Sequence, residues 1–392
     1  MRVRITAMTS LMDMMIFTRT FQDASETYSD LLNALGQYPN YAFIMSHGSS
    51  TPIGKLIVQY RETDWEFAKR LASHFNLMLV PSFVQSKTHF YFGTPFIASS
   101  VQLNDSSIQI NRRLDEYEIR SQRGVSITEN DMTDYIVRSR EILEIGAMVS
   151  LLNRTLCVYE INSQLEGSEL IHTYTLRTQN GFLVPKIENP RAIGASLEAR
   201  IIDINADMVR VHALIDSHQD VATARWFSYS SVFSSPDGTG WYSMPEEGDT
   251  VRLHFPSAKE DEAYVISAVH LESDTDLRSD PSVHSLRNRY NQEIRLTPTS
   301  ISLTNNKGIA ITIDDEAGIF IESNKDINIK SEGEIAISSV DEQVAILATK
   351  GIELTKVATE DAEAESIGAS KDDSRIVVSD KIIFSGNEVN IE

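Results

Sequence analysis

Paired carboxylates are the residues of this sequence whose chemistry could support hydrolysis. Asp261 precedes Glu262, and Asp314 precedes Asp315. A glycoside hydrolase needs two carboxylates that face each other across a cleft, whereas neighbouring side chains in a turn point in different directions. We therefore expect these acids to lie in solvated turns, and the sequence predicts no catalytic residue.

Histidine and cysteine are not spaced as metal ligands. The chain has nine histidines and one cysteine. No two histidines form a His-x-His or His-x-x-x-His pair, and Cys157 lies alone in the strand-like run 155–159. A metal site needs several such ligands close together. We therefore expect no metal and no cofactor, and a buried structural role for Cys157.

Two glycines, Gly238 and Gly240, could suggest a phosphate-binding loop. No Gly-Lys-Ser or Gly-Lys-Thr follows them, and no strand-loop-helix pattern surrounds them. These features are required by a P-loop. The sequence instead favours a β-turn that feeds Trp241 into a barrel.

The composition excludes some partners and some locations. The formal net charge is −21, from 35 basic and 56 acidic residues, which argues against nucleic acid or an anionic membrane as the main partner. The apolar run 11–17 is interrupted by Asp13 and is too short for a signal peptide or a membrane span. We expect assembly in the cytoplasm without a signal peptide.

The elements that would position these residues are mainly β with some α. Helices are predicted over 25–35 and 64–75, from apolar residues at helical spacing. Five strand-like runs between 194 and 270 are typical of an OB-like antiparallel barrel. The predicted regions are a hub-like α+β region (1–190), the barrel (194–270), a charged linker (271–289) and a repeat region (290–392).

The repeat region carries a pair of aliphatic residues, spaced i and i+2, about every eight residues. The pairs are Ile301 and Leu303, Ile309 and Ile311, Ile319 and Ile321, Ile327 and Ile329, Ile335 and Ile337, Val344 and Ile346, and Ile352 and Leu354. Alternation places both members of a pair on one face of a short strand. One such strand cannot bury its apolar face alone, so the face must close against later coils or other copies of the chain. The pattern is typical of a solenoid or a β-prism.

Two motifs resemble those of one protein family. The run 59–72 has the pattern Tyr-Arg-Glu-Thr-Asp-Trp-x-Phe-x-x-Arg-Leu-Ala, and 237–251 contains a Met-Pro-x-x-Gly-Asp turn that leads into a strand. The motif positions are Asp64, Trp65, Phe67, Arg70, Leu71, Gly240, Trp241, Met244, Pro245, Gly248 and Asp249. In this order, and followed by the repeat, they resemble the VgrG and phage late-control-D family. This family comprises the hub and spike proteins of contractile injection systems, and the resemblance extends from about Phe21 to Glu392.

The resemblance implies a homotrimer that joins the tail tube and baseplate proteins to a piercing tip. Its hub would lie beneath the tube, its OB-like domains would form a collar, and its C-termini would intertwine as a prism that pierces the target envelope. A tip-capping protein or an effector could bind the C-terminal end; 385–392 holds no histidine, so a separate cap would have to bring any metal. Family members usually begin with a strand-rich segment before the first helix, so a helix near Ser25 implies a reduced hub or one completed by another chain.

Three alternatives stay open at the sequence level. Asp64, Trp65 and Arg70 could form a catalytic or partner-contacting cluster, although a helix start with Trp65 in the core is favoured, with Arg70 as an interchain contact. A β-helical polysaccharide-degrading tailspike would need longer coils and facing carboxylates, and an adhesin would need an export signal. The short interval between His270 and Tyr290 leaves no room for a lysozyme domain.

Overall fold

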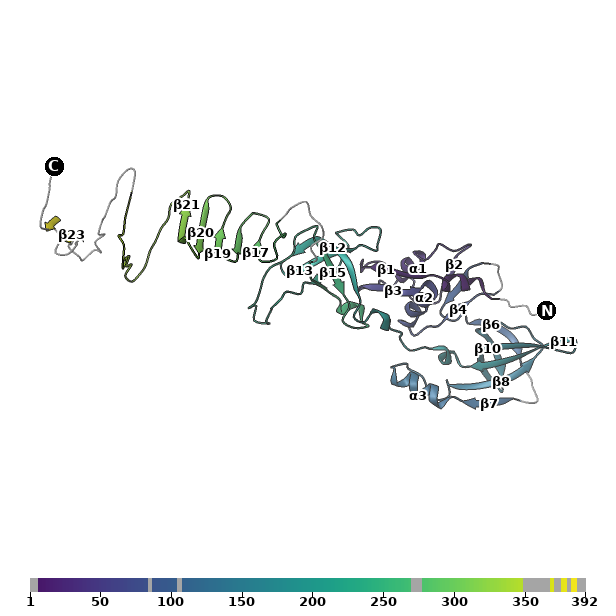
Figure 1. Cartoon of the computed structure of the whole chain (residues 1–392). Helices are drawn as coiled ribbons and strands as arrows, with labels where there is room; N and C mark the ends of the chain where they lie inside the picture. Colours follow the sequence, from purple (N-terminus) through teal and green to yellow (C-terminus); the bar gives the residue numbers. More distant parts are fainter. Residues whose placement is uncertain are drawn as a thin grey trace. The chain divides into compact units, whose positions relative to one another are not determined.

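The computed structural model describes residues 6–83, 87–103, 108–268 and 277–347, together with the backbone of three later strands (Figure 1). The chain divides into two compact units, Met1–Ser273 and Asp274–Glu392. Strands predominate in both units, which confirms the predicted class of mainly β with some α.

The first unit begins with a small α+β region. Its elements are η1 (Met8–Asp13), β1 (Ile16–Phe21), α1 (Tyr28–Asn33), β2 (Ala42–Met45), β3 (Ile57–Thr63), α2 (Asp64–Ser73), β4 (Leu79–Pro81) and β5 (His89–Phe92). The strands form two small sheets, β1-β3 and β2-β5-β4. Both helices start with a capping box, at Thr27 and Thr63, whose hydroxyls accept the backbone N–H three residues later. The apolar side of α2 is buried against both sheets through Phe67 and Leu71.

A six-stranded sheet with its own core follows. Its elements are β6 (Ile97–Gln102), β7 (Gln109–Arg112), α3 (Leu114–Gln122), β8 (Thr133–Ser139), β9 (Ala147–Leu151), β10 (Arg154–Glu166) and β11 (Glu169–Arg177). The strand order is β6-β9-β10-β11-β8-β7. The core contains Val137, Val149, Leu156, Val158 and Tyr174, which lie on strands β8 to β11. Two short 3-10 helices, η2 (Gln179–Phe182) and η3 (Pro190–Ala192), lead to the next domain.

A five-stranded barrel completes the first unit. Its elements are β12 (Ser196–Asn205), β13 (Met208–Ala213), β14 (Trp226–Ser228), β15 (Thr250–His254), η4 (Glu260–Glu262) and β16 (Tyr264–Ile266). The order is β14-β13-β12-β15-β16, and a bridge between Tyr229 and Val265 joins the two edge strands. Each predicted run between 194 and 270 contains one of these strands.

Strand β3 contributes to two cores at once, because successive side chains of a strand point to opposite faces. Ile57 is buried in the core around α2, whereas Leu56 and Val58 are buried in the core of the barrel. The α+β region and the barrel are therefore joined by a shared strand and not only by a connecting loop.

The second unit starts with an antiparallel meander. Its strands are β17 (His284–Arg287), β18 (Glu293–Leu296), β19 (Ser300–Thr304), β20 (Ile309–Asp314) and β21 (Gly318–Ser323), in sequential order. Strand β17 lies inside the segment predicted as a linker, and Leu286 is paired with Ile294. The linker prediction is therefore wrong from His284 onward, because a strand with a single apolar residue leaves no periodic pattern. Strands β22 (Ile367–Ala369), β23 (Arg375–Val378) and β24 (Ile382–Ser385) form a separate sheet.

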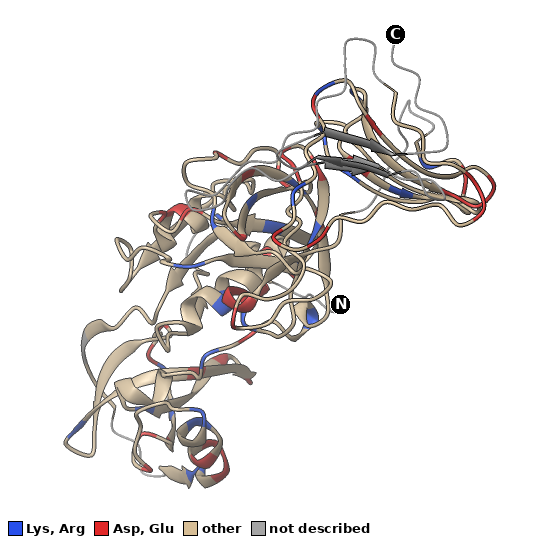
Figure 2. Ribbon diagram, turned by 90° about the vertical axis from the view of Figure 1, so that its left-hand side faces the viewer, with Lys and Arg blue, Asp and Glu red and all other residues tan. Residues whose placement is uncertain are grey.

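Charged residues are distributed along the described chain. The colours of the ribbon in Figure 2 mark acidic residues interspersed with basic ones in both units. No helix in the described residues is long and apolar enough to cross a membrane.

Candidate functional site

The first motif, in the run 59–72, lies at the contact between the α+β region and the barrel. Arg70 on α2 is 1% exposed, and its guanidinium reaches two carboxylates from different elements. Nε and Nη2 donate to the Glu62 carboxylate at 2.9 and 2.8 Å, and Nη1 donates to Glu260 Oε1 at 2.6 Å. Nη2 also donates to the Val58 carbonyl oxygen at 2.7 Å. We call Glu62, Arg70 and Glu260 the ionic junction.

Within the ionic junction, Arg70 and Glu260 lie 190 positions apart in the sequence, because Glu260 belongs to η4 of the barrel. Burial lowers the pKa of Arg70, but the Glu62 hydrogen bond and the charges of Glu260 and Glu62 outweigh it, so its pKa is raised. Burial also raises the pKa of Glu62, against the opposing effect of Arg70. The Arg70 side chain is enclosed by partners of its own chain, so the prediction of an interchain contact at Arg70 is wrong.

Asp64, the first residue of α2, lies in a second buried polar cluster. Its side chain is fully buried and accepts hydrogen bonds from Arg19 Nη1 at 2.9 Å and Gln59 Nε2 at 2.9 Å. Tyr38 Oη donates to the other carboxylate oxygen at 2.7 Å. Burial and this bond raise the pKa of Tyr38 to about 12. The carboxylate ties β1, β3 and the segment after α1 to the N-terminus of α2, where the helix dipole favours a negative charge.

The remaining residues of the first motif pack in the core. Trp65 lies edge-on to Phe90, with 5.8 Å between ring centroids, and Phe67 and Leu71 are fully buried. The exposed side of α2 carries Glu66, which is bound by Arg191 at 2.8 Å. This hydrogen bond lowers the pKa of Glu66 to about 2. The motif therefore stabilises the fold and leaves no free polar constellation of catalytic type among these residues.

The second motif fixes a turn to the barrel. Met244 packs against the barrel core, and Pro245 is buried. Gly248 has φ +94°, which favours glycine, and its N–H donates to the Ile201 carbonyl at 2.9 Å. The Asp249 carboxylate accepts the Glu246 N–H at 2.8 Å. The Ile201 N–H donates in turn to the Asp249 carbonyl at 2.9 Å, so two hydrogen bonds attach the end of the turn to strand β12.

Trp241 does not enter the barrel, and that prediction is wrong. It is 60% exposed on a small hairpin, where its backbone N–H donates to the Phe233 carbonyl at 2.8 Å. A Cβ at Gly240 would lie 2.4 Å from the same carbonyl oxygen, so the hairpin needs glycine there. The barrel interior is already filled by Phe227 and Phe255, which are buried.

The other candidate residues for chemistry are dispersed. Cys157 is buried in β10, and burial raises the pKa of its thiol to about 11. Asp261 and Glu262 lie on η4, and Asp314 ends β20, where its carboxylate accepts the backbone N–H groups of the following turn. Within the described residues, no group of three or more His, Cys, Asp or Glu side chains could hold a metal ion.

The second unit presents an apolar sheet face that is open to solvent in the single chain. Register places Leu303 between Ile294 and Ile311, and places Ile311 beside Ile321. The exposed aliphatic residues are Leu286, Ile294, Leu296, Ile301, Leu303, Ile309, Ile311, Ile313, Ile319 and Ile321. We call these residues the open apolar face. Ile319 is 71% exposed, whereas Ser300 and Ser302, on the opposite face of β19, are half-buried.

The repeat pattern found only part of the open apolar face. It missed Leu286, Ile294 and Leu296, which precede the first repeat, and Ile313, which extends a pair to a triplet on β20. The later pairs Ile327 and Ile329, Ile335 and Ile337, and Val344 and Ile346 are exposed and lie outside the strands β17 to β21. Ile352 and Leu354 lie outside the described residues.

The sequence of the barrel matches a known protein family. Residues 198–270 match the family described as the type VI secretion system/phage-baseplate injector OB domain. This match confirms the predicted resemblance for the barrel, which contains the second motif. No curated protein matches the chain.

Three solved structures are similar at low sequence identity. The E. coli c3393 protein, a type VI secretion component, is 15% identical, with a TM-score of 0.47 over 66% of this chain and 75% of that chain. A chain of the Francisella PdpA–VgrG complex is 11% identical, with a TM-score of 0.43 over 80% and 70%. The 43 kDa tail protein of prophage MuSo2 from Shewanella oneidensis is 12% identical, with a TM-score of 0.31 over 42% and 67%.

Proposed function

We propose that this chain is a hub and spike protein at the tip of a contractile injection apparatus. The proposal starts from the match of residues 198–270 to an injector OB domain. The apparatus is a phage tail, a phage-tail-like bacteriocin, or a type VI or extracellular injection system. The protein joins the tube and baseplate at its hub end and pierces the target envelope with its C-terminal end. Its role is mechanical, and it needs no cofactor.

The open apolar face is the observation that supports this proposal most strongly. Aliphatic side chains from five neighbouring strands are aligned across the sheet, and they stay exposed in the single chain. Burying one such side chain contributes roughly 1.5–3 kcal/mol, so a face of this kind is covered in the native assembly. Three copies related by rotation would cover each other's faces in a homotrimeric prism.

The ionic junction suits the same role in the first unit. A force on the barrel reaches α2 through the Arg70 and Glu260 pair and through strand β3, whose side chains belong to both cores. A small displacement of the barrel would separate Arg70 from Glu260 while both are still buried, and a buried charge without its partner is costly. The arrangement is therefore suited to keep the hub and the barrel together during piercing.

The mass of the purified protein in solution tests the trimer. Light scattering should give three times the chain mass of 43.9 kDa at every concentration above the dissociation limit. A monodisperse monomer would contradict the prism. Electron microscopy of particles purified from the native host, decorated with an antibody against the barrel, tests the location separately. Label along the sheath, or on no particle, would contradict the placement at the tip even if the protein is a trimer.

A further inference from the structure

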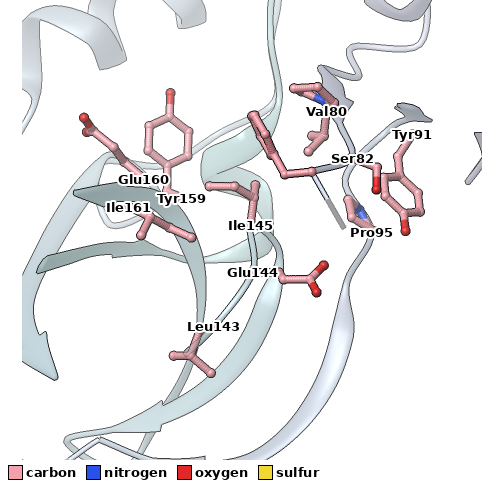
Figure 3. A pocket seen from close by; sticks show the side chains of 12 residues that line it. Val80, Ser82, Tyr91, Pro95, Leu143, Glu144, Ile145, Tyr159, Glu160 and Ile161 are labelled. Carbon is pink, nitrogen blue, oxygen red and sulfur yellow. The ribbon is translucent and has the colours of Figure 1, made fainter. Parts of the chain in front are cut away.

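A hollow of about 460 Å³ lies between two sheets of the first unit (Figure 3). Its walls come from the β2-β5-β4 sheet, from the loop that precedes β9, and from strand β10. The residues on which its chemistry depends are Val80, Tyr91, Glu144, Ile145, Tyr159 and Glu160. A volume of this size lies within the range of protein pockets that bind ligands.

Strand β10 has an unpaired edge beside this hollow. Its ladder with β9 ends at the pair of Cys157 and Met148, and the Val158 carbonyl still accepts the Gly146 N–H at 2.8 Å. Beyond Val158, in the described residues, the strand pairs only with β11. A bulge at Tyr159 interrupts that second ladder. Bulges re-aim side chains and occur near functional sites. The backbone of β10 can therefore offer hydrogen bonds to an extended segment in the hollow, as sheet edges do in strand addition.

The opposite wall is less suited to strand pairing. Strand β4 is the edge of its sheet, and Pro81 has no backbone N–H to donate. A bound segment would pair with β10 and place side chains against Val80 and Tyr91. This geometry favours one extended chain and not a second sheet.

The side chains around the hollow combine an apolar centre with acidic sides. Ile145 projects between the two walls, and Tyr91 and Tyr159 add aromatic surface (Figure 3). Glu144 extends toward the wall that bears Tyr91, whereas Glu160 lies on the other side, beside Tyr159 (Figure 3). Both glutamates are exposed, and neither forms an ion pair with the described residues.

We propose that this hollow binds an extended segment of another protein in which aliphatic or aromatic residues are flanked by arginine or lysine. The apolar residues fill the centre, and the cations reach Glu144 and Glu160 and the faces of the tyrosines. A phosphate-bearing partner is disfavoured because it would bring negative charge toward two carboxylates. The inference holds whether or not the chain is a spike.

The test uses a labelled peptide and the full-length protein. The probe is an acetylated and amidated peptide with two arginines on each side of a Leu-Phe-Leu centre, and its binding is followed by fluorescence anisotropy. We expect saturable binding that weakens at least tenfold in the double variant Glu144→Gln and Glu160→Gln, and that weakens as salt is raised. Glu118→Gln, on the exposed side of α3, is the matched control and should bind like the wild type.

Two further measurements locate the site. A peptide with glutamate in place of arginine should not bind, and the bound arginine peptide should slow hydrogen exchange in β10 and in the segment 143–147. Equal binding by the double glutamine variant, or no saturable binding, would overturn the proposal.

Discussion

The ionic junction buries charged groups within one chain, whereas the open apolar face leaves apolar side chains exposed in the single chain. At the junction, every charged group has its partner within the same chain, and Arg70 alone makes contacts with Glu62, Glu260 and a backbone carbonyl. On the C-terminal sheet, the backbone ladders are complete between neighbouring strands, but the aliphatic side chains have no cover in the single chain. The first unit pairs its buried charges within one chain, whereas the second unit leaves an apolar face uncovered in the single chain.

This contrast separates two kinds of mutational effect. Changes at the junction should alter the free energy of unfolding of the first unit without changing the number of chains in the assembly. Changes on the open apolar face should alter assembly without unfolding the barrel.

The largest effect is expected for charges on the open apolar face. Leu303 and Ile311 are paired across β19 and β20, and the double variant Leu303→Asp and Ile311→Asp would bury two carboxylates per chain in the assembled prism. Each unpaired buried charge costs several kcal/mol, and each substitution also removes the roughly 1.5–3 kcal/mol contributed by the aliphatic side chain. We expect loss of the trimer by light scattering, with an unchanged barrel.

The register supplies a matched control for this variant. Ser302 and Thr312 are also paired across β19 and β20, but they lie on the opposite face. The double variant Ser302→Asp and Thr312→Asp introduces the same cross-strand repulsion between like charges. It should remain a trimer. Loss of the trimer in both double variants would show that the sheet, and not its apolar face, controls assembly.

The second effect concerns the ionic junction. Arg70→Met leaves Glu62 and Glu260 buried without their cation, and such broken pairs cost about 3–5 kcal/mol. Urea denaturation followed by tryptophan fluorescence should show this loss in the first unit. Adding Glu62→Gln and Glu260→Gln to Arg70→Met should recover part of it, because the uncompensated charges are then removed.

Arg191→Met provides the comparison at the protein surface. Arg191 also binds a glutamate, Glu66, on the same helix, but both side chains are partly exposed. Exposed ion pairs contribute about 0.2–1 kcal/mol. Similar losses for Arg70→Met and Arg191→Met would mean that burial does not distinguish the two pairs.

The third effect is a pH dependence of the first unit. Burial lowers the pKa of His74 to about 3, with further lowering by Arg70, Lys55 and Lys186, and Tyr28 Oη lies 2.9 Å from His74 Nδ1. The folded pKa lies below the unfolded value of about 6.5, so this stability is present above pH 6.5 and declines as the pH falls toward 3.

The variant His74→Asn keeps a polar side chain but cannot titrate. Between pH 6.5 and 5, the wild type should lose about 1–2 kcal/mol more unfolding free energy than this variant. Equal losses in the two proteins would show that His74 titrates alike in the folded and unfolded states.

Much of the fold was predictable because local patterns dominate it. The apolar spacing of residues in α1 and α2 predicted both N-terminal helices, and strand-like runs predicted the five barrel strands. The aliphatic pairs predicted an unpartnered sheet face. These features depend on residues that are close in the sequence, so the amino-acid sequence alone is enough to predict them.

The contacts that were missed are long-range. Nothing near Arg70 in the sequence indicates Glu260, which lies 190 positions away. The sequence therefore led to the expectation that Arg70 contacts another chain. The sequence predicts that a β-turn feeds Trp241 into the barrel, whereas Gly240 and the Phe233 carbonyl hold it on a hairpin. The hollow is lined by strands and a loop that lie far apart in the sequence, and no sequence motif links them.

The smallest effect is expected for the paired acids of the second unit. The Asp314 carboxylate accepts the N–H groups of Glu316 and Ala317 at 3.0 and 2.9 Å, and these bonds lower its pKa. Its position in a turn explains its chemistry without catalysis. Asp314→Ala with Asp315→Ala should therefore leave the trimer intact and particle injection within about twofold of the wild type. If this variant assembled normally but lost injection or killing, the acids would act on the target, and the purely mechanical role of the C-terminal sheet would be wrong.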